Sequence, residues 1–456
     1  MGWKLRDESA RGMVMLSPRL SRAGGRPAWT RAVGVGIALL FSAGLATAQD
    51  AKDKKSNDDE KPKTGDTKTV EPLPPLTLGE CLAIGHERQP VIRAALHSLR
   101  AAEIGYQSLM NLRAFTERVS PDIPVRREQA RRGLALSTAE VQKATQETTQ
   151  DVTFLYFSYV YAKQSEQTAT DVIEQMETYY EVAESIVKSG VRDPKIKINQ
   201  FTLYALQNLI GEVKQLRVKA STGRQLALTA LKDAMGVEPT FAFEPATKEL
   251  PLMLDGTVTK EQVIADALAR RPELAQAATG VDVFRLEICA QEKVQFGKRV
   301  ATLASGSDLH AKQVPMAIRN GTYRPGALAP EMPVGFVGNQ ADRVAHAAEL
   351  SLRQDVLYEK TVNLVRTEAT VAYLNWDAAT KRVREAKRRY ENGRRLVEDS
   401  RAAAVARQDP ELLVNTEALA GKAQADYVEA VLEHIKTLAA LERVTAGGIY
   451  PKFPTR

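Results

Sequence analysis

Residues 77–96 read TLGECLAIGHERQPVIRAAL, and residues 259–278 read TKEQVIADALARRPELAQAA. Each stretch begins with a threonine, and a proline follows at the same position in both, Pro90 in the first and Pro272 in the second. In each, a Glu or Gln is the third residue after the threonine, which is the pattern of a helix capping box. The repeated start signal predicts a duplicated chain in which each half begins with a capped, proline-marked helix.

A very long helix is predicted after the first start signal. Leu134 to Ser189 contains no glycine and no proline, and as one helix it would be about 84 Å long. Its apolar residues recur at spacings of three and four in two neighbouring stripes, which is typical of a coiled coil with neighbours on two sides. The turn Lys188–Pro194 and a return helix to Met235 complete an antiparallel hairpin.

The same plan recurs in the second half of the chain. A long helix is predicted at Asn339–Arg407, and its turn places Asp409-Pro410 where the first turn has Asp193-Pro194. The two turns lie further apart in the chain than the two helix starts do. The second half therefore holds an insertion, within which Asn320-Gly321 is a tight-turn signal. The expected organisation is a signal peptide at 1–48, a disordered charged linker at 49–75, a first repeat at 76–250, a second repeat at 251–448 with a Gly/Pro-rich insertion at 295–338, and a tail at 449–456.

The N-terminal region predicts export. The apolar run Ala32–Leu45 follows several arginines and precedes the small-residue sequence Ala46-Thr47-Ala48. Such a run is short for a membrane span and fits a cleaved signal peptide. The formal charge of +7 is interpreted as solvated basic helix faces and not as a nucleic-acid surface.

Catalytic and metal-binding patterns are not found in the sequence. The five histidines have no metal-ligand spacing, and no nucleophile, phosphate-loop or zinc-protease motif occurs. We therefore expect no cofactor, no metal and no enzyme activity. Cys81 and Cys289 are both interpreted as small buried residues, and His434 as a packed or interface residue on an apolar stripe. The aromatic residues between Phe154 and Tyr161 fit either helix packing or a membrane-interface belt.

The order of these elements resembles the TolC-like outer-membrane efflux protein family. The resemblance covers about Leu76 to Gly448 and is carried by LTLGECLAIGHERQPVIRAA, by YFSYVYA in the long helix, by DAMGVEP at the end of the first half and by the two Asp-Pro turns. It implies a homotrimer whose six hairpins form a periplasmic helical tunnel, with strands from each subunit forming a shared outer-membrane barrel. Such proteins are passive exit ducts that partner an inner-membrane pump and a periplasmic adaptor protein. The adaptor contacts are expected at the tip turns, which here comprise Gly190, Val191, Arg192, Asp193, Pro194, Arg407, Gln408, Asp409 and Pro410.

The two connectors where membrane strands would lie depart from this pattern. Arg113–Gly133 carries several charges, two prolines and no apolar alternation, and it is too short for two spanning strands and a turn. Four prolines in Gln295–Gly338 disfavour regular strands there. The predicted fold is therefore mainly α, with duplicated long antiparallel coiled-coil hairpins that form an α-helical barrel as a trimer, and with a reduced or absent β-barrel portion. Two functions stay open: an outer-membrane efflux or secretion duct, and a periplasmic coiled-coil structural or interaction protein without a membrane-spanning barrel.

Overall fold

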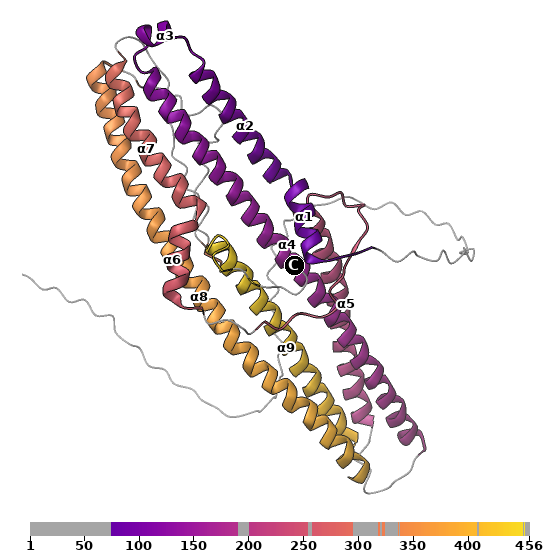
Figure 1. Cartoon of the computed structure of the whole chain (residues 1–456). Helices are drawn as coiled ribbons and strands as arrows, with labels where there is room; N and C mark the ends of the chain where they lie inside the picture. Colours follow the sequence, from indigo (N-terminus) through magenta and orange to yellow (C-terminus); the bar gives the residue numbers. More distant parts are fainter. Residues whose placement is uncertain are drawn as a thin grey trace, which may run out of the picture. The chain divides into compact units, whose positions relative to one another are not determined.

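The computed structural model describes residues 74–189, 200–253, 258–294, 318–319, 322–323, 336, 338–407, 410–449 and 451. Most of these residues are helical (Figure 1). None of the described helices is both long and apolar enough to cross a membrane. The helices are α1 (Leu78–Arg88), α2 (Pro90–Met110), α3 (Ala114–Val119), α4 (Ile123–Ser189), α5 (Gln200–Ala234), α6 (Lys260–Arg270), α7 (Pro272–Lys293), α8 (Gln340–Arg407) and α9 (Pro410–Val444).

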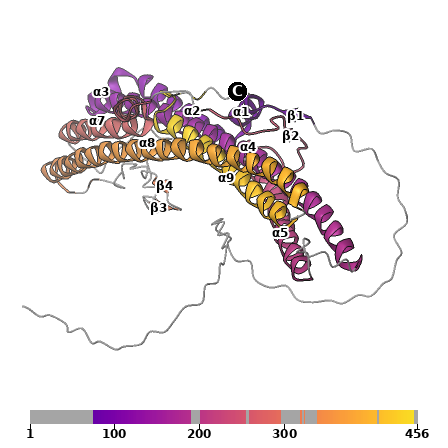
Figure 2. The same ribbon diagram turned by 90° about the horizontal axis from the view of Figure 1, so that it is seen from below.

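Two short strand pairs accompany the helices. The strand β1 (Pro75–Leu76) pairs in parallel with β2 (Glu244–Pro245). The strand β3 (Ile318–Arg319) pairs antiparallel with β4 (Thr322–Tyr323), and Arg319 lies opposite Thr322 (Figure 2). The predicted tight-turn signal Asn320-Gly321 lies outside the described residues.

The predicted helix starts are confirmed. The Thr77 hydroxyl accepts the Glu80 N–H, and the Glu80 carboxylate accepts the Thr77 N–H at 2.7 Å, which completes the capping box. In the second copy the Thr259 hydroxyl accepts the Gln262 N–H. Pro90 and Pro272 each occupy the first turn of a new helix, where a missing N–H costs nothing. The prolines thus mark joins between helices and not kinks within one.

The start of the first long helix was predicted too late. α4 begins at Ile123 and not at Leu134, because Pro124 lies in its first turn, where proline is tolerated. Together with α3, this makes the first connector helical over most of its length, and no strand occurs in the described stretch between Asn111 and Ile123. The prediction that this connector does not form spanning strands is confirmed. α4 has 67 residues and α8 has 68, so each long helix runs past several shorter ones.

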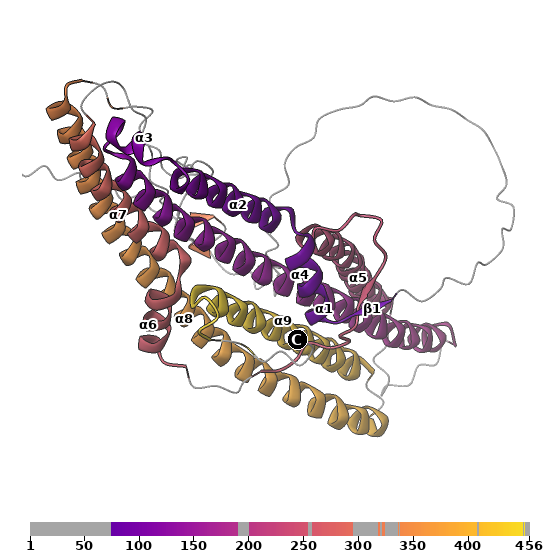
Figure 3. The same cartoon turned by 45° about the horizontal axis from the view of Figure 1, so that its top comes forward.

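The helices form a layer whose order changes along its length. The N-terminal half of α4 contacts α2 and α7, and its C-terminal half contacts α5 and α9. α8 contacts α7 and α6 and then α9 (Figure 3). Across one half of the layer, the order of neighbouring helices is therefore α2, α4, α7, α8. Across the other half, the order is α5, α4, α9, α8. In both halves α8 is one edge of the layer, and α2 or α5 is the other.

The main apolar core lies where the two halves of the layer meet. Tyr156 and Phe157 of α4 are fully buried there among residues of α1, α5, α8 and α9. The Tyr156 hydroxyl hydrogen-bonds Thr247 at 2.9 Å and donates to the Leu76 carbonyl at 3.2 Å, so it holds the β1–β2 pair against α4. Of the two interpretations of the aromatic residues, these contacts support helix packing.

The join between α1 and α2 closes on the end of α5. Gln89 donates to the Asp233 and Ala234 carbonyls at 3.3 and 3.0 Å, which satisfies the end of that helix. Gly236 follows with φ +66, and a side chain there would lie 2.7 Å from the Gln89 Cα. Glycine is therefore required at this position, and the predicted end of the return helix is confirmed.

The two cysteines differ from each other. Cys81 is fully buried, as predicted, and burial raises the pKa of its thiol to about 12. Cys289 lies on the exposed side of α7, so its predicted burial was wrong. Its helix has a buried stripe, and position 289 falls between the buried residues Glu287 and Ala290.

Candidate functional site at the hairpin ends and layer edges

The predicted tip residues are only partly described. Gly190, Val191, Arg192, Asp193 and Pro194 lie outside the described residues, as do Gln408 and Asp409. Arg407 is the last residue of α8 and Pro410 is the first of α9. The two hairpins end at the same end of the layer, which is the lower end in Figure 1. The structure thus brings the described helix ends that flank the two predicted turns to one end of the layer.

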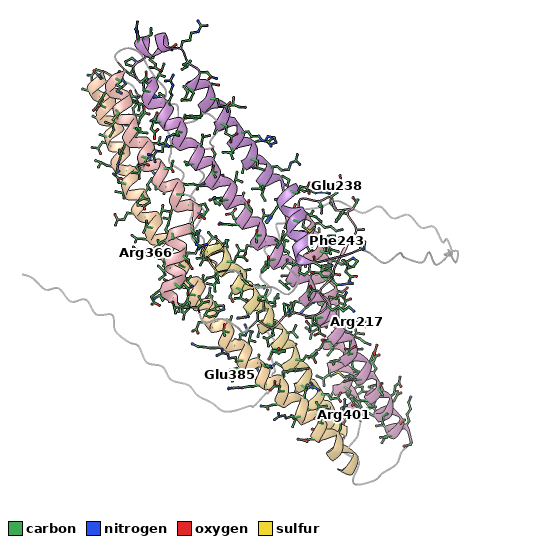
Figure 4. The ribbon with its side chains drawn as sticks, viewed as in Figure 1. Arg217, Glu238, Phe243, Arg366, Glu385 and Arg401 are labelled. Atoms are coloured by element: carbon green, nitrogen blue, oxygen red, sulfur yellow. The ribbon has the colours of Figure 1, made fainter. Side chains whose placement is uncertain are left out.

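A hydrogen-bonded group joins three helices near these ends. The carboxylate of Glu417 on α9 accepts from the Tyr179 hydroxyl of α4 and from the Arg401 guanidinium of α8, each at 3.0 Å. Figure 4 shows Arg401 in the last part of α8. Glu417 is buried, and burial together with this carboxylate raises the pKa of Tyr179. This group, called the Glu417 link, fastens the first hairpin to the second.

The edges of the layer carry exposed apolar side chains. On α5 they share one helical face, opposite the buried Leu203 and Leu206, and Phe201 is 78 % exposed. α8 carries a similar series along its free side, where Val356 is 64 % exposed. Exposed apolar side chains that recur along one face of a helix favour a contact with another chain at that face. These edge residues are Leu96 and Ile104 on α2, Phe201, Tyr204, Val218 and Leu226 on α5, and Leu352, Val356, Leu374 and Leu396 on α8.

The two long helices carry opposite charge near the hairpin ends. The stretch 165–185 of α4 contains several acidic side chains and no basic one, whereas the corresponding stretch 381–401 of α8 contains about twice as many basic as acidic side chains. On α8, Arg384, Lys387, Arg394 and Arg395 are exposed and have no ion pair with any described residue. The hairpins are therefore similar in shape but different in electrostatic surface.

A buried polar cluster fastens the other end of the layer. Arg126 of α4 makes a paired contact with Glu287 of α7, and Gln129 and Gln291 donate to the same carboxylate at 2.8 and 2.7 Å. All four side chains are buried. Because the carboxylate and the guanidinium satisfy each other inside the layer, the cluster fixes the position of α7 against α4.

Two arginines occupy equivalent places in the two halves. Arg127 donates to the carbonyls of Leu109 and Leu112 at 2.8 and 3.2 Å, at the end of α2. Arg343 donates to the Val294 carbonyl at 2.7 Å, at the end of α7. The number of residues between Arg127 and Arg343 equals the number between the two Asp-Pro turns. The number between Leu112 and Val294 equals the number between the two helix starts. Each arginine therefore joins the start of a long helix to the end of the helix before the connector, and together they are called the arginine clasps.

A second buried ion cluster holds α6, α8 and α9 together. Arg271 donates to Glu368 of α8 at 2.7 Å and to Glu273, and Arg443 of α9 contacts the same Glu368. Burial alone would lower the pKa of Arg271, but the hydrogen bonds and charges of Glu273 and Glu368 raise it overall. Arg271 therefore stays charged near neutral pH, and the cluster is structural in character.

Catalytic geometry does not emerge from the described part of the chain. No group of His, Cys, Asp or Glu within it is placed to hold a metal ion. A small cavity of about 90 Å³ lies between α4 and the end of α9, lined by Gln146, Thr149 and Gln150 on one side. His434 is buried as predicted, and burial lowers its pKa. The features that stand out in the described part of the chain are the hairpin ends and the edges of the layer.

Comparison with known proteins gives a clear result for the fold. No protein-family model matches the chain, and no curated protein matches it in sequence. Among solved structures, the outer-membrane channel OprN is 16 % identical with a TM-score of 0.61, covering 82 % of this chain and 91 % of its own. The open-state MtrE outer-membrane channel of Neisseria gonorrhoeae is 16 % identical with a TM-score of 0.60, covering 86 % and 98 %. The outer-membrane protein VceC of Vibrio cholerae is 12 % identical with a TM-score of 0.59, covering 82 % and 96 %.

These similarities establish the fold. The described helices have the arrangement of TolC-like outer-membrane channels over most of the chain, so the predicted resemblance is confirmed at the level of architecture. At identities of 11–16 % the likeness shows the fold alone, because proteins of one fold can have different functions.

Proposed function

We propose that this protein is the subunit of a passive duct in an outer-membrane efflux or secretion assembly. Three copies would place six long hairpins around a common axis to form a helical tunnel. The proposal is supported by the TolC-like fold and by the edges of the layer. A single layer with apolar side chains along both edges is an open structure, and closing it on further copies removes those side chains from water.

The hairpin ends are the proposed contact with a periplasmic adaptor protein and, through it, an inner-membrane pump. The residues concerned are Gly190–Pro194 in the first turn and Arg407–Pro410 in the second. Beside them, the Glu417 link would hold the two hairpins of one subunit at a fixed spacing. Near the hairpin ends, α4 would present an acidic surface to an adaptor and α8 a basic one. The contact surface of the adaptor should therefore carry both signs of charge.

Charge reversal tests the adaptor contact. Arg192→Glu and Arg407→Glu place opposite charge in the two turns and should weaken binding of the purified adaptor several-fold. Arg366→Glu is the control, because Arg366 is exposed on α8 far from the turns (Figure 4). Equal adaptor affinity of the turn variants and the control would remove these residues from the proposed contact.

A second candidate is a periplasmic structural or interaction protein with the same hairpins. The helical first connector favours it, because α3 and the start of α4 occupy the place where the resemblance puts membrane strands. Membrane fractionation separates the two candidates. A protein that needs detergent for extraction is an integral duct component, whereas release by carbonate alone would support the structural protein.

A further inference from the structure

The corner between α2 and α4 is fixed in place by one arginine. This α2–α3 corner comprises Met110 to Ser120 and includes α3, which lies at the end of the layer opposite the hairpin ends (Figure 1). Arg127 donates to the Leu109 and Leu112 carbonyls and also pairs with Glu117 of α3. Because these contacts join α2, α3 and α4, the surface of the corner is presented in a defined orientation.

The exposed surface of this corner combines apolar and basic side chains. Met110, Leu112 and Val119 are exposed, and Val119 is 65 % accessible. Arg113 and Arg118 are exposed beside them and have no ion pair with any described residue. The nearby carboxylates are already engaged, Glu117 with Arg127 and Asp122 with Arg126. The corner therefore has a net positive, partly apolar surface.

We propose that the α2–α3 corner rests on an anionic lipid surface. Apolar side chains that enter the boundary between headgroups and acyl chains, with arginines that meet lipid phosphates, are the chemistry of an interfacial contact. A second copy of the chain is expected along the side edges of the layer, where the apolar residues run in long series. The corner instead lies at the end of the layer, where a tunnel would meet a membrane, and the inference rests on the proposed function in this respect only.

The contact made by one corner is weak. Three apolar side chains and two arginines resemble a single weak anchor, which by itself binds membranes reversibly. A trimer would carry three such corners at the same end, and binding of the first would bring the others close to the same surface. Vesicle binding should therefore depend both on anionic lipid and on assembly.

Vesicle flotation with the full mature chain tests the proposal. The probes are vesicles of phosphatidylcholine with phosphatidylglycerol and vesicles of phosphatidylcholine alone. The wild-type protein should bind the anionic vesicles, with affinity that falls as salt rises. Arg113→Glu combined with Arg118→Glu should weaken this binding by about tenfold or more, and Val119→Glu should also weaken it. The matched control is Arg88→Glu with Arg270→Glu, two exposed arginines on α1 and α6 that lie outside the corner and the edge series, with the same change of charge.

The results separate this inference from the proposed duct. Equal binding of the corner and control variants to anionic vesicles would overturn the inference. A wild-type trimer that does not bind anionic vesicles would also overturn it. Dissociation of the trimer by the corner variants, with vesicle binding unchanged, would show that the corner is a subunit contact and would also overturn it. The oligomeric mass of every variant is measured in parallel, and a wild-type monomer would count against the duct itself.

Discussion

At the residue scale, the buried pair of Arg126 and Glu287 should matter most for stability. Arg126→Ala would leave a buried carboxylate without its cation, and we expect the free energy of unfolding to fall by about 3–5 kcal/mol. Lys381→Ala is the control, because Lys381 and Asp377 form an exposed i,i+4 pair, and its effect should stay below about 1 kcal/mol. Urea unfolding followed by circular dichroism measures both, and similar losses would contradict the account.

His434 should make the protein sensitive to acid. Burial lowers its pKa, so the folded state holds the ring neutral where the unfolded chain takes up a proton. Above the ordinary histidine pKa of about 6.5 the two states bind protons equally, and below it the unfolding free energy falls as pH falls. His434→Leu should flatten the pH dependence of the thermal unfolding midpoint between neutral and mildly acidic pH. An unchanged dependence would show that other groups cause it.

These two sites also show what the sequence could predict. His434 falls on an apolar helical stripe, and its packing was predicted from that spacing alone. The pairing of Arg126 with Glu287 could not be predicted, because the two are 161 positions apart and each is an ordinary charged residue in a charged helix. Only the contact between α4 and α7 makes them a buried pair.

At the scale of elements, the arginine clasps should hold the ends of the connectors. Arg343 reaches the Gln291 side chain and the Val294 and Gly338 carbonyls with different nitrogens of one guanidinium. A lysine ammonium is a single nitrogen, so it cannot replace three guanidinium nitrogens that donate in different directions. Arg343→Lys should therefore loosen the end of α7. Hydrogen exchange should become about tenfold faster at residues 290–294 and stay unchanged in α5. No change at α7, or an equal change in both helices, would contradict a local clasp.

The elements themselves were largely readable from the sequence. Thr77, Pro90 and Gly236 mark real helix boundaries, because capping, proline and positive-φ glycine act locally. The start of α4 was missed because the long helix was expected only after the last proline and glycine of the first connector, although the first turn of a helix accepts proline. The clasps left a signal in the sequence, since Arg127 and Arg343 keep the separation of the two turns.

At the scale of the whole molecule, the edges should control assembly. Phe201→Asp with Leu226→Asp places two charges on the apolar face of α5, and we expect the trimer to dissociate into monomers that remain helical. Val91→Asp is the control, because Val91 is also exposed but lies at the start of α2, outside the edge series. Light scattering coupled to size exclusion measures the masses, and a trimer that tolerates both edge charges would exclude this face of α5 from the interface.

The proposed assembly of this chain is a closed helical tunnel of three subunits. The sequence predicted the hairpins from their spacing, but the position of the edges depends on which helices lie next to each other, and that emerged only from the three-dimensional contacts. The most direct measurement is the native mass of the mature protein, extracted gently and measured without crosslinking. We predict a mass three times that of the mature chain. A stable monomer at micromolar concentration, with its apolar edges open to water, would contradict the account.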